Sequence, residues 1–151
     1  IRFNQPLYYS GKRIAGVSLT FKDGVVIAAS ATENEDALKE MIAQDNADKV
    51  GEFSLTDRRH SRITKFMATT LYDENTGGDY GNTHIAVGNA YKDTFTGDMS
   101  AVTDEQWAAM GYNSCPKVHT DIISTTNRTV TATLHDNTSL VIYKEGQFVL
   151  D

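Results

Sequence analysis

The chain has a single cysteine, Cys115, so an internal disulfide framework is excluded and a reducing compartment such as the cytoplasm is favoured. Basic residues are also few: the chain has 14 of them and 20 acidic residues. A chain without a basic face is not expected to bind nucleic acid. No apolar run approaches the ~20 residues that cross a bilayer, so no membrane partner is expected. Repeats, linkers and low-complexity stretches are also missing, and 151 residues suit a single domain, 1–151.

The residues that are present predict an α+β fold, with a mixed, largely antiparallel sheet, hairpins and a few short helices. Helical spacing predicts helices over 33–44 and 62–72, and a third helix that opens at Thr103, ends before Gly111 and is anchored by Trp107 and Met110. A polar loop is expected over 73–82. Alternation of polar and apolar residues predicts strands at 13–22, 25–30, 50–56, 84–90, 118–124, 129–134, 139–144 and 147–150.

Three of these strands share one design, an apolar face and a polar face that carries possible metal ligands. In 51–56, Phe53 and Leu55 point one way and Glu52 the other. We expect the apolar face to be buried and the glutamate to lie on the opposite side of the sheet.

The second and third strands carry the histidines. In 84–88, His84 shares its face with small residues that leave room beside the imidazole; in 118–122, His119 and Asp121 project side by side. Two imidazoles and two carboxylates suit zinc, cobalt or manganese without a thiolate.

These residues alone leave two interpretations open. A histidine and an aspartate two positions apart on a strand often occur by chance, and a strand glutamate is usually solvated, so the chain can equally be an α+β domain without metal. The other two histidines, His60 and His135, lie in turn-like polar stretches and are interpreted as surface residues.

Five segments of the chain, in this order, resemble the aminopeptidase T and aminopeptidase S family of dimetal exopeptidases. They are GVSLTFKDG (16–24), GEFSL (51–55), TLYDEN (70–75), HIAVGNAY (84–91) and HTD (119–121). Five ordered blocks are far more specific than any one of them.

The resemblance implies that Glu52, His84, His119 and Asp121 are metal ligands and that Tyr91 is the catalytic tyrosine. In catalysis Glu52 can be a ligand, a proton shuttle, or both, and the sequence does not separate these roles. It implies two divalent ions (zinc, cobalt or magnesium) and a reaction that removes amino-terminal residues from peptide substrates. It also implies a cytoplasmic enzyme that is a homodimer at full length. The 73–75 segment is interpreted as a helix end and polar turn and is not included in the ligand set.

The family has a further glutamate ligand and a large amino-terminal domain, whereas this chain starts at Ile1. We therefore expect the carboxy-terminal, metal-ligand part of a longer aminopeptidase, weak or inactive in isolation. Departures beside the site, such as Thr56-Asp57 in place of the family's Val-Pro and a longer 77–81 loop, leave the matched ligands intact. Two alternatives stay open: a non-catalytic packing or oligomerisation domain, and a metal hydrolase that acts on something other than peptides.

Overall fold

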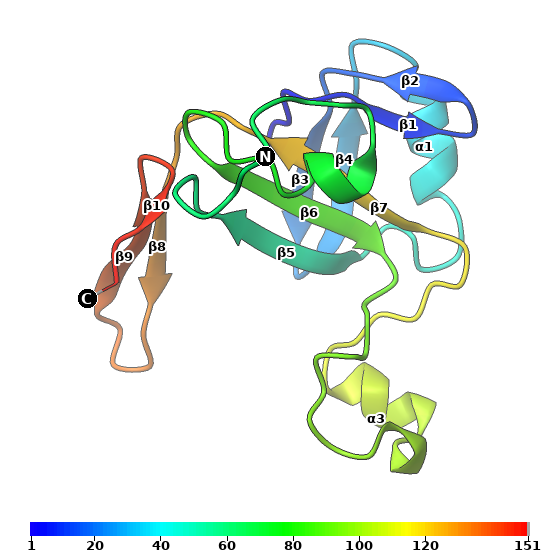
Figure 1. Ribbon diagram of the computed structural model, residues 1–151. Helices are drawn as coiled ribbons and strands as arrows, with labels where there is room; N and C mark the ends of the chain where they lie inside the picture. Colours follow the sequence, from blue (N-terminus) through cyan, green and yellow to red (C-terminus); the bar gives the residue numbers. More distant parts are fainter. Residues whose placement is uncertain (151) are drawn as a thin grey trace.

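The computed structural model describes residues 1–150, which form small antiparallel sheets and a few short helices (Figure 1). In chain order the elements are β1 (Leu7–Tyr9), β2 (Lys12–Ile14), β3 (Ser18–Lys22), β4 (Val25–Ser30), α1 (Glu35–Ile42), β5 (Val50–Thr56), α2 (Thr70–Asp73), β6 (Asn82–Gly88), the 3₁₀ turn η1 (Met99–Ala101), α3 (Asp104–Ala109), β7 (His119–Ser124), β8 (Thr129–Thr133), β9 (Ser139–Lys144) and β10 (Gln147–Phe148). The sheets are β1-β2, β3-β4, β5-β6-β7 and β10-β9-β8, all antiparallel. The expected α+β class is confirmed.

The β5-β6-β7 sheet forms the middle of the molecule, and β6 pairs with both of its neighbours (Figure 1). On its apolar face Val87 and Ile122 are fully buried. Phe53 shares this face, since it pairs with Ile85, but it is 57% exposed. The expectation that Phe53 is buried is wrong because, within residues 1–150, β5 has a sheet partner on one side only.

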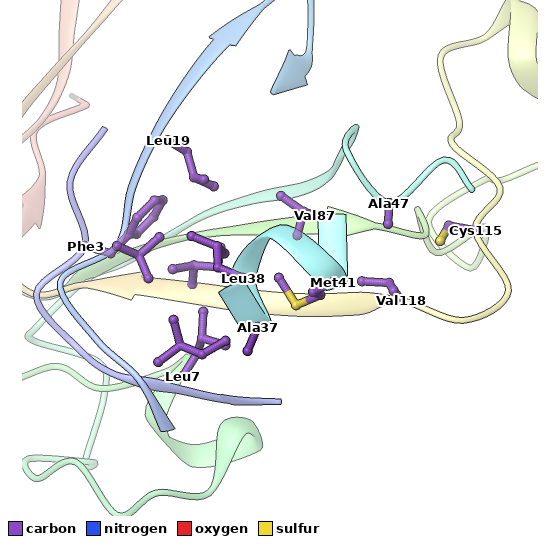
Figure 2. Packing of buried hydrophobic residues seen from close by; sticks show 13 residues of the cluster. Phe3, Leu7, Leu19, Ala37, Leu38, Met41, Ala47, Val87, Cys115 and Val118 are labelled. Atoms are coloured by element: carbon purple, nitrogen blue, oxygen red, sulfur yellow. The ribbon is translucent and has the colours of Figure 1, made fainter. Parts of the chain in front are cut away.

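The hydrophobic core lies between α1, the first hairpins and the central sheet. One face of α1 buries Leu38 and Met41, three positions apart as helical spacing requires. Figure 2 shows these side chains gathered with Phe3, Val87 and Val118 in a single cluster. Burying a side chain of this size stabilises the fold by about 1.5–3 kcal/mol. The cluster therefore anchors the strands whose other face is polar.

The strand expected over 13–22 is interrupted at Gly16. Its φ of +63° lies in the left-handed region, and a Cβ atom at this position would lie 2.3 Å from Oγ1 of Thr32. The chain therefore forms two short strands, β2 and β3, in place of one long strand.

The helix expected over 62–72 is wrong for most of its length, since only the short α2 is helical. The reason is the buried carboxylate of Asp73, which accepts hydrogen bonds from the N–H groups of Met67 (2.6 Å) and Thr69 (2.7 Å). These bonds hold the segment in a turn with Ala68 at φ +55°, a conformation that a right-handed helix does not contain.

Two further parts extend from the central sheet (Figure 1). The β8-β9-β10 sheet is tied to it by the Tyr143 hydroxyl, which is within hydrogen-bonding distance of the carbonyls of Thr56 (2.8 Å) and Tyr80 (3.1 Å). The other part carries α3, which begins after Thr103 as expected and has a capping box between Thr103 and Gln106.

Aromatic contacts hold the α3 segment together. The ring of Trp107 makes edge-on contacts with Phe95 and Tyr112 and is buried, as expected for an anchor. Met110 is exposed, and its expected role as a second anchor is wrong, since the neighbouring rings already surround Trp107. Among the described residues, no helix combines the length and the apolarity that a membrane span requires.

Candidate metal centre

The central sheet brings four of the predicted site residues onto its polar face. Glu52 pairs with Ala86, which in turn pairs with Asp121, so the two carboxylates flank a small side chain. His84 precedes Ala86 by two positions on β6, and His119 precedes Asp121 by two positions on β7. Residues two apart on a strand point to the same face. The sheet register therefore gathers all four side chains around the methyl group of Ala86.

Each oxygen of the Glu52 carboxylate faces one imidazole. Oε1 lies 2.9 Å from Nε2 of His84, and Oε2 lies 3.6 Å from Nε2 of His119. Oδ1 of Asp121 lies 3.7 Å from Nε2 of each histidine. Two atoms bound to one tetrahedral zinc ion are about 3.3 Å apart at ordinary bond lengths. The separations are thus compatible with a shared metal ion, and each carboxylate is placed between the two imidazoles.

Both imidazoles are oriented through their other ring nitrogen. Nδ1 of His84 lies 2.9 Å from the carbonyl oxygen of Glu74, and Nδ1 of His119 lies 2.7 Å from that of Asn89. A carbonyl oxygen only accepts, so Nδ1 carries the proton in both rings. Nε2 of each ring is then the nitrogen that faces the carboxylates, as in histidines that bind a metal ion through Nε2 and are oriented through Nδ1.

A third carboxyl group, that of Glu74, joins the site, although the ligand set predicted from the sequence does not include it. It lies just after α2, and its carboxyl group neighbours that of Asp121. Burial raises the pKa of Glu74 to about 7, and the negative charge of Asp121 adds to the rise. The structure places Asp73 elsewhere, in the turn described above. The TLYDEN segment carries the signal for Glu74, but a polar turn does not reveal which of its side chains points inward.

The donor set fits a divalent cation. Oδ1 of Asp121 is buried and receives no hydrogen bond from the described residues. Buried polar atoms normally have a partner, and a bound cation would supply one here. Ligand atoms of Glu52, His119 and Asp121 all lie within 4.8 Å of one another. Imidazole nitrogen and carboxylate oxygen are ligands that zinc, cobalt and manganese accept. No positively charged lysine or arginine pairs with these carboxylates in the described residues.

Tyr91 lies at the rim of this cluster. Its ring centroid is 4.3 Å from that of His119, with the two planes tilted by 39°, and its side chain is 56% exposed. A groove of about 570 Å³ opens beside Tyr91 and Glu52. Met110 and Tyr112 also line it. The tyrosine hydroxyl is thus free to face a molecule in the groove.

The other two histidines of the chain lie apart from the centre. His60 is exposed after β5, and His135 is exposed between β8 and β9, as expected for surface residues. The fold and the cluster together define a protein with a candidate site for divalent cations, in which two imidazoles and two carboxylates on one face of a sheet are joined by the carboxyl group of Glu74.

Comparisons with known proteins agree with this class. The profile of the family described as "Thermophilic metalloprotease (M29)" matches residues 1–148, so the chain belongs to that family. It is 32% identical to aminopeptidase PepS of Streptococcus thermophilus over 97% of this chain and 35% of that protein. It is 29% identical to aminopeptidase T of Thermus aquaticus over 99% of this chain and 36% of that protein.

A solved structure shares the fold. Wild-type AmpT from Thermus thermophilus superposes with a TM-score of 0.83 at 25% identity, covering 99% of this chain and 36% of that one. The chain thus spans little more than a third of the length of these relatives.

Proposed function

We propose that this chain is the carboxy-terminal, metal-ligand part of a metal-dependent aminopeptidase that removes amino-terminal residues from peptides. The observation that carries the proposal is the convergence of Glu52, His84, His119 and Asp121, with both Nε2 atoms directed at carboxylate oxygens. Family membership and relatives named as aminopeptidases support the reaction class.

Two divalent ions, zinc, cobalt or magnesium, are the proposed cofactors, and when bound they supply Lewis acidity that lowers the pKa of water and polarises a carbonyl group. Glu52 is the better placed base, because its side chain is 38% exposed whereas that of Asp121 is 6% exposed. An accessible carboxylate oxygen can take a proton from the attacking water and return it to the leaving amine. Glu52 therefore has two proposed roles, as a ligand and as a proton shuttle.

Tyr91 is the proposed catalytic donor. Its exposed position over His119 lets the hydroxyl donate a hydrogen bond to the oxyanion that develops on the scissile carbonyl. The adjoining groove offers the substrate a wall that includes Met110 and Tyr112, next to Glu52. A peptide with its first residue in the groove would present its amino-terminal carbonyl to the cluster.

The full-length enzyme is proposed to be a cytoplasmic homodimer, with the rest of the active site outside this chain. The single buried cysteine supports a reducing compartment. The apolar residues exposed on the β8-β9-β10 part support an interface with another chain or another part of the enzyme. These are Leu140, Val141, Phe148, Val149 and Leu150. Alone, the 151-residue chain is proposed to bind metal weakly and to have little activity.

Calorimetric titration of the 151-residue chain with zinc, cobalt and magnesium tests the metal site. We expect binding that raises the melting temperature, since a ligand that binds only the folded state stabilises it. His119→Ala should abolish the effect. His135→Ala is the matched control, because that imidazole is exposed and remote from the cluster. Equal behaviour of both variants, or no binding to the wild type, would instead favour a non-catalytic packing domain.

The reaction class needs the full-length enzyme. Hydrolysis of leucyl and other aminoacyl amides, with no turnover of phosphoester substrates, is the expected result. The opposite preference would identify a metal hydrolase that acts on something other than peptides.

A further inference from the structure

A buried asparagine amide holds the carbonyl group that orients His84. Asn82, two positions before His84 on β6, is fully buried. Its Nδ2 donates to the carbonyl oxygens of Glu74 (2.7 Å) and Thr76 (3.0 Å) and lies 3.5 Å from that of Asp73. The Glu74 carbonyl thus accepts from both Asn82 and His84. It belongs to a turn and not to a sheet ladder, so the amide is what fixes its direction.

A second buried asparagine acts on His119 through the residues on either side of the carbonyl that orients this ring. The Nδ2 of Asn113, which is 8% exposed, donates to the Gly88 carbonyl (2.6 Å), and the N–H of Ala90 donates to the Asn113 carbonyl (2.8 Å). These two bonds bracket Asn89, whose carbonyl oxygen accepts from Nδ1 of His119. The second Nδ2 hydrogen of Asn113 reaches the Asn46 carbonyl (2.7 Å), which ties the segment to the loop after α1.

We infer that Asn82 and Asn113 are positioning residues of the metal site, each fixing the main-chain carbonyl that sets the tautomer of one ligating histidine. The inference rests on the proposed function, because the roles it assigns serve metal binding. Asn82 also holds the turn from which Glu74 places its carboxyl group against Asp121, so one amide positions an imidazole and a carboxyl group together.

An imidazole with a single proton can carry it on either ring nitrogen. An imidazole without an acceptor at Nδ1 is free to carry its proton on Nε2, where it would donate to Glu52 and would have no lone pair for a metal ion. Both acceptors lie in irregular segments, which water could otherwise solvate. A buried amide with its two hydrogens committed to carbonyl groups removes that freedom. Replacing the amide NH2 group of Asn82 or Asn113, which donates, by an oxygen, which only accepts, should therefore change the tautomer of one histidine.

Two-bond ¹H–¹⁵N correlation spectra of the metal-free 151-residue chain test this directly. Recorded over a range of pH, the spectra distinguish a ring protonated on Nδ1 from one protonated on Nε2 and from one protonated on both nitrogens. In the wild type we expect Nδ1–H at His84 and at His119. A proton on Nε2 alone, in either ring, would overturn the inference.

The variants are Asn82→Asp and Asn113→Asp, which keep the shape and remove the donor, and Asn82→Ala and Asn113→Ala, which remove it without adding charge. We expect the Asn82 variants to lose the Nδ1–H tautomer of His84 only, and the Asn113 variants that of His119 only. General loss of structure would alter both rings, so this selectivity is a readout that a merely structural role would not give. Asn34→Asp is the matched control, because its exposed amide donates to the Arg13 carbonyl, away from the site.

Zinc affinity supplies the second readout. Loss of an outer partner of a ligating histidine typically weakens metal binding about 10- to 100-fold, and we expect this for all four variants. The added negative charge of an aspartate would by itself strengthen cation binding, so a weaker affinity of Asn82→Asp has to come from the lost donor. Zinc binding with unchanged tautomers and affinity in the variants would overturn the inference while the proposed function stands. Selective tautomer changes in a chain that binds no metal would support the orienting role and refute the metal site.

Discussion

Nε2 of His84 lies 2.9 Å from Oε1 of Glu52, although the same imidazole already uses its Nδ1 proton for the Glu74 carbonyl. A neutral ring in that tautomer would bring two lone pairs into contact. The contact is therefore favourable only when one of the two groups binds a further proton or when a metal ion lies between them. This contact, more than the presence of histidines on strands, makes the sheet face a candidate metal centre.

Replacing Asp121 by asparagine should separate metal binding from stability. The Oδ1 atom is buried without a partner among the described residues and lies near the carboxyl groups of Glu52 and Glu74. Without metal, we expect Asp121→Asn to raise the free energy of unfolding by about 1 kcal/mol, since a neutral amide ends the repulsion. With zinc at about 100 times its dissociation constant, the wild type should gain about 2.7 kcal/mol and the variant far less.

Urea unfolding with a chelator and then with zinc measures both effects. The order of stability of the two proteins should invert between the two conditions. A variant that is less stable than the wild type in chelator would contradict the view that these carboxylates oppose folding until a cation binds.

Tyr91→Phe tests the proposed oxyanion donor in the full-length enzyme. The phenyl ring can still pack on His119, so zinc affinity should be unchanged, whereas the lost hydroxyl should lower kcat about 100- to 1000-fold with little effect on KM. Steady-state hydrolysis of a leucyl amide, together with calorimetric titration, measures the two. Tyr72→Phe, exposed on α2, is the control and should keep the wild-type kcat. A drop in kcat equal in both variants would exclude a specific role for Tyr91.

The site was predictable where strand periodicity decides the outcome. Alternation placed His84, His119 and Asp121 on polar strand faces, and antiparallel pairing of β6 with β7 brings these faces together. Alternation says which face a side chain takes but not whether anything covers that face. Phe53 illustrates the difference: it points as expected, yet it is exposed at an edge of the sheet.

Glu74 and the 62–72 segment were beyond sequence reasoning for a common reason. Their conformation depends on side chains that bind main-chain groups of the same turn, Asp73 from within it and Asn82 from across β6. The helical spacing of apolar residues in 62–72 favours a helix less strongly than two hydrogen bonds to a buried carboxylate favour the turn. No local pattern marks which polar residue of such a turn faces inward.

Gly88→Ala should damage both the fold and the site. Gly88 has a φ of +99°, pairs with His119 and would place a Cβ atom 2.1 Å from the Val118 carbonyl oxygen. Gly24→Ala is the matched control: its φ is +77°, but an added Cβ atom would have no atom within 4 Å beyond its chain neighbours. The left-handed φ alone costs about 1–2 kcal/mol.

We expect Gly24→Ala to lose about that amount and to bind zinc normally. Gly88→Ala should lose clearly more, because β7 has to move, and the displaced His119 should weaken zinc binding. Chemical unfolding and calorimetric titration of both variants check this. Equal losses of stability would mean that the close approach to Val118 is relieved at no cost.

Asp57 makes the free energy of unfolding of the chain depend on pH in the acid range. This buried carboxylate accepts hydrogen bonds from the side chain and the N–H of Arg59 and from the N–H of Phe148 (2.8 Å), which joins the end of β5 to β10. The Arg59 guanidinium holds the pKa of Asp57 well below its usual range. Asp57→Asn should therefore lower the free energy of unfolding near neutral pH by roughly 2 kcal/mol, as for hydrogen bonds to a charged group.

A depressed pKa in the folded state stabilises the fold above the pKa of the unfolded chain, about 3.9 for aspartate, and this stability is lost as the pH falls toward the folded value. The difference in unfolding free energy between the wild type and Asp57→Asn should thus be full above about pH 5 and shrink steadily below about pH 4. Urea unfolding across this range measures it. Asp136→Asn is the control: the pKa of Asp136 is also lowered, by the Thr138 hydroxyl, but the residue is exposed, so its pH-dependent difference should be much smaller. If the difference in unfolding free energy between the wild type and Asp57→Asn stays constant down to the lowest pH measured, the Asp57 carboxylate is not the charged partner of Arg59.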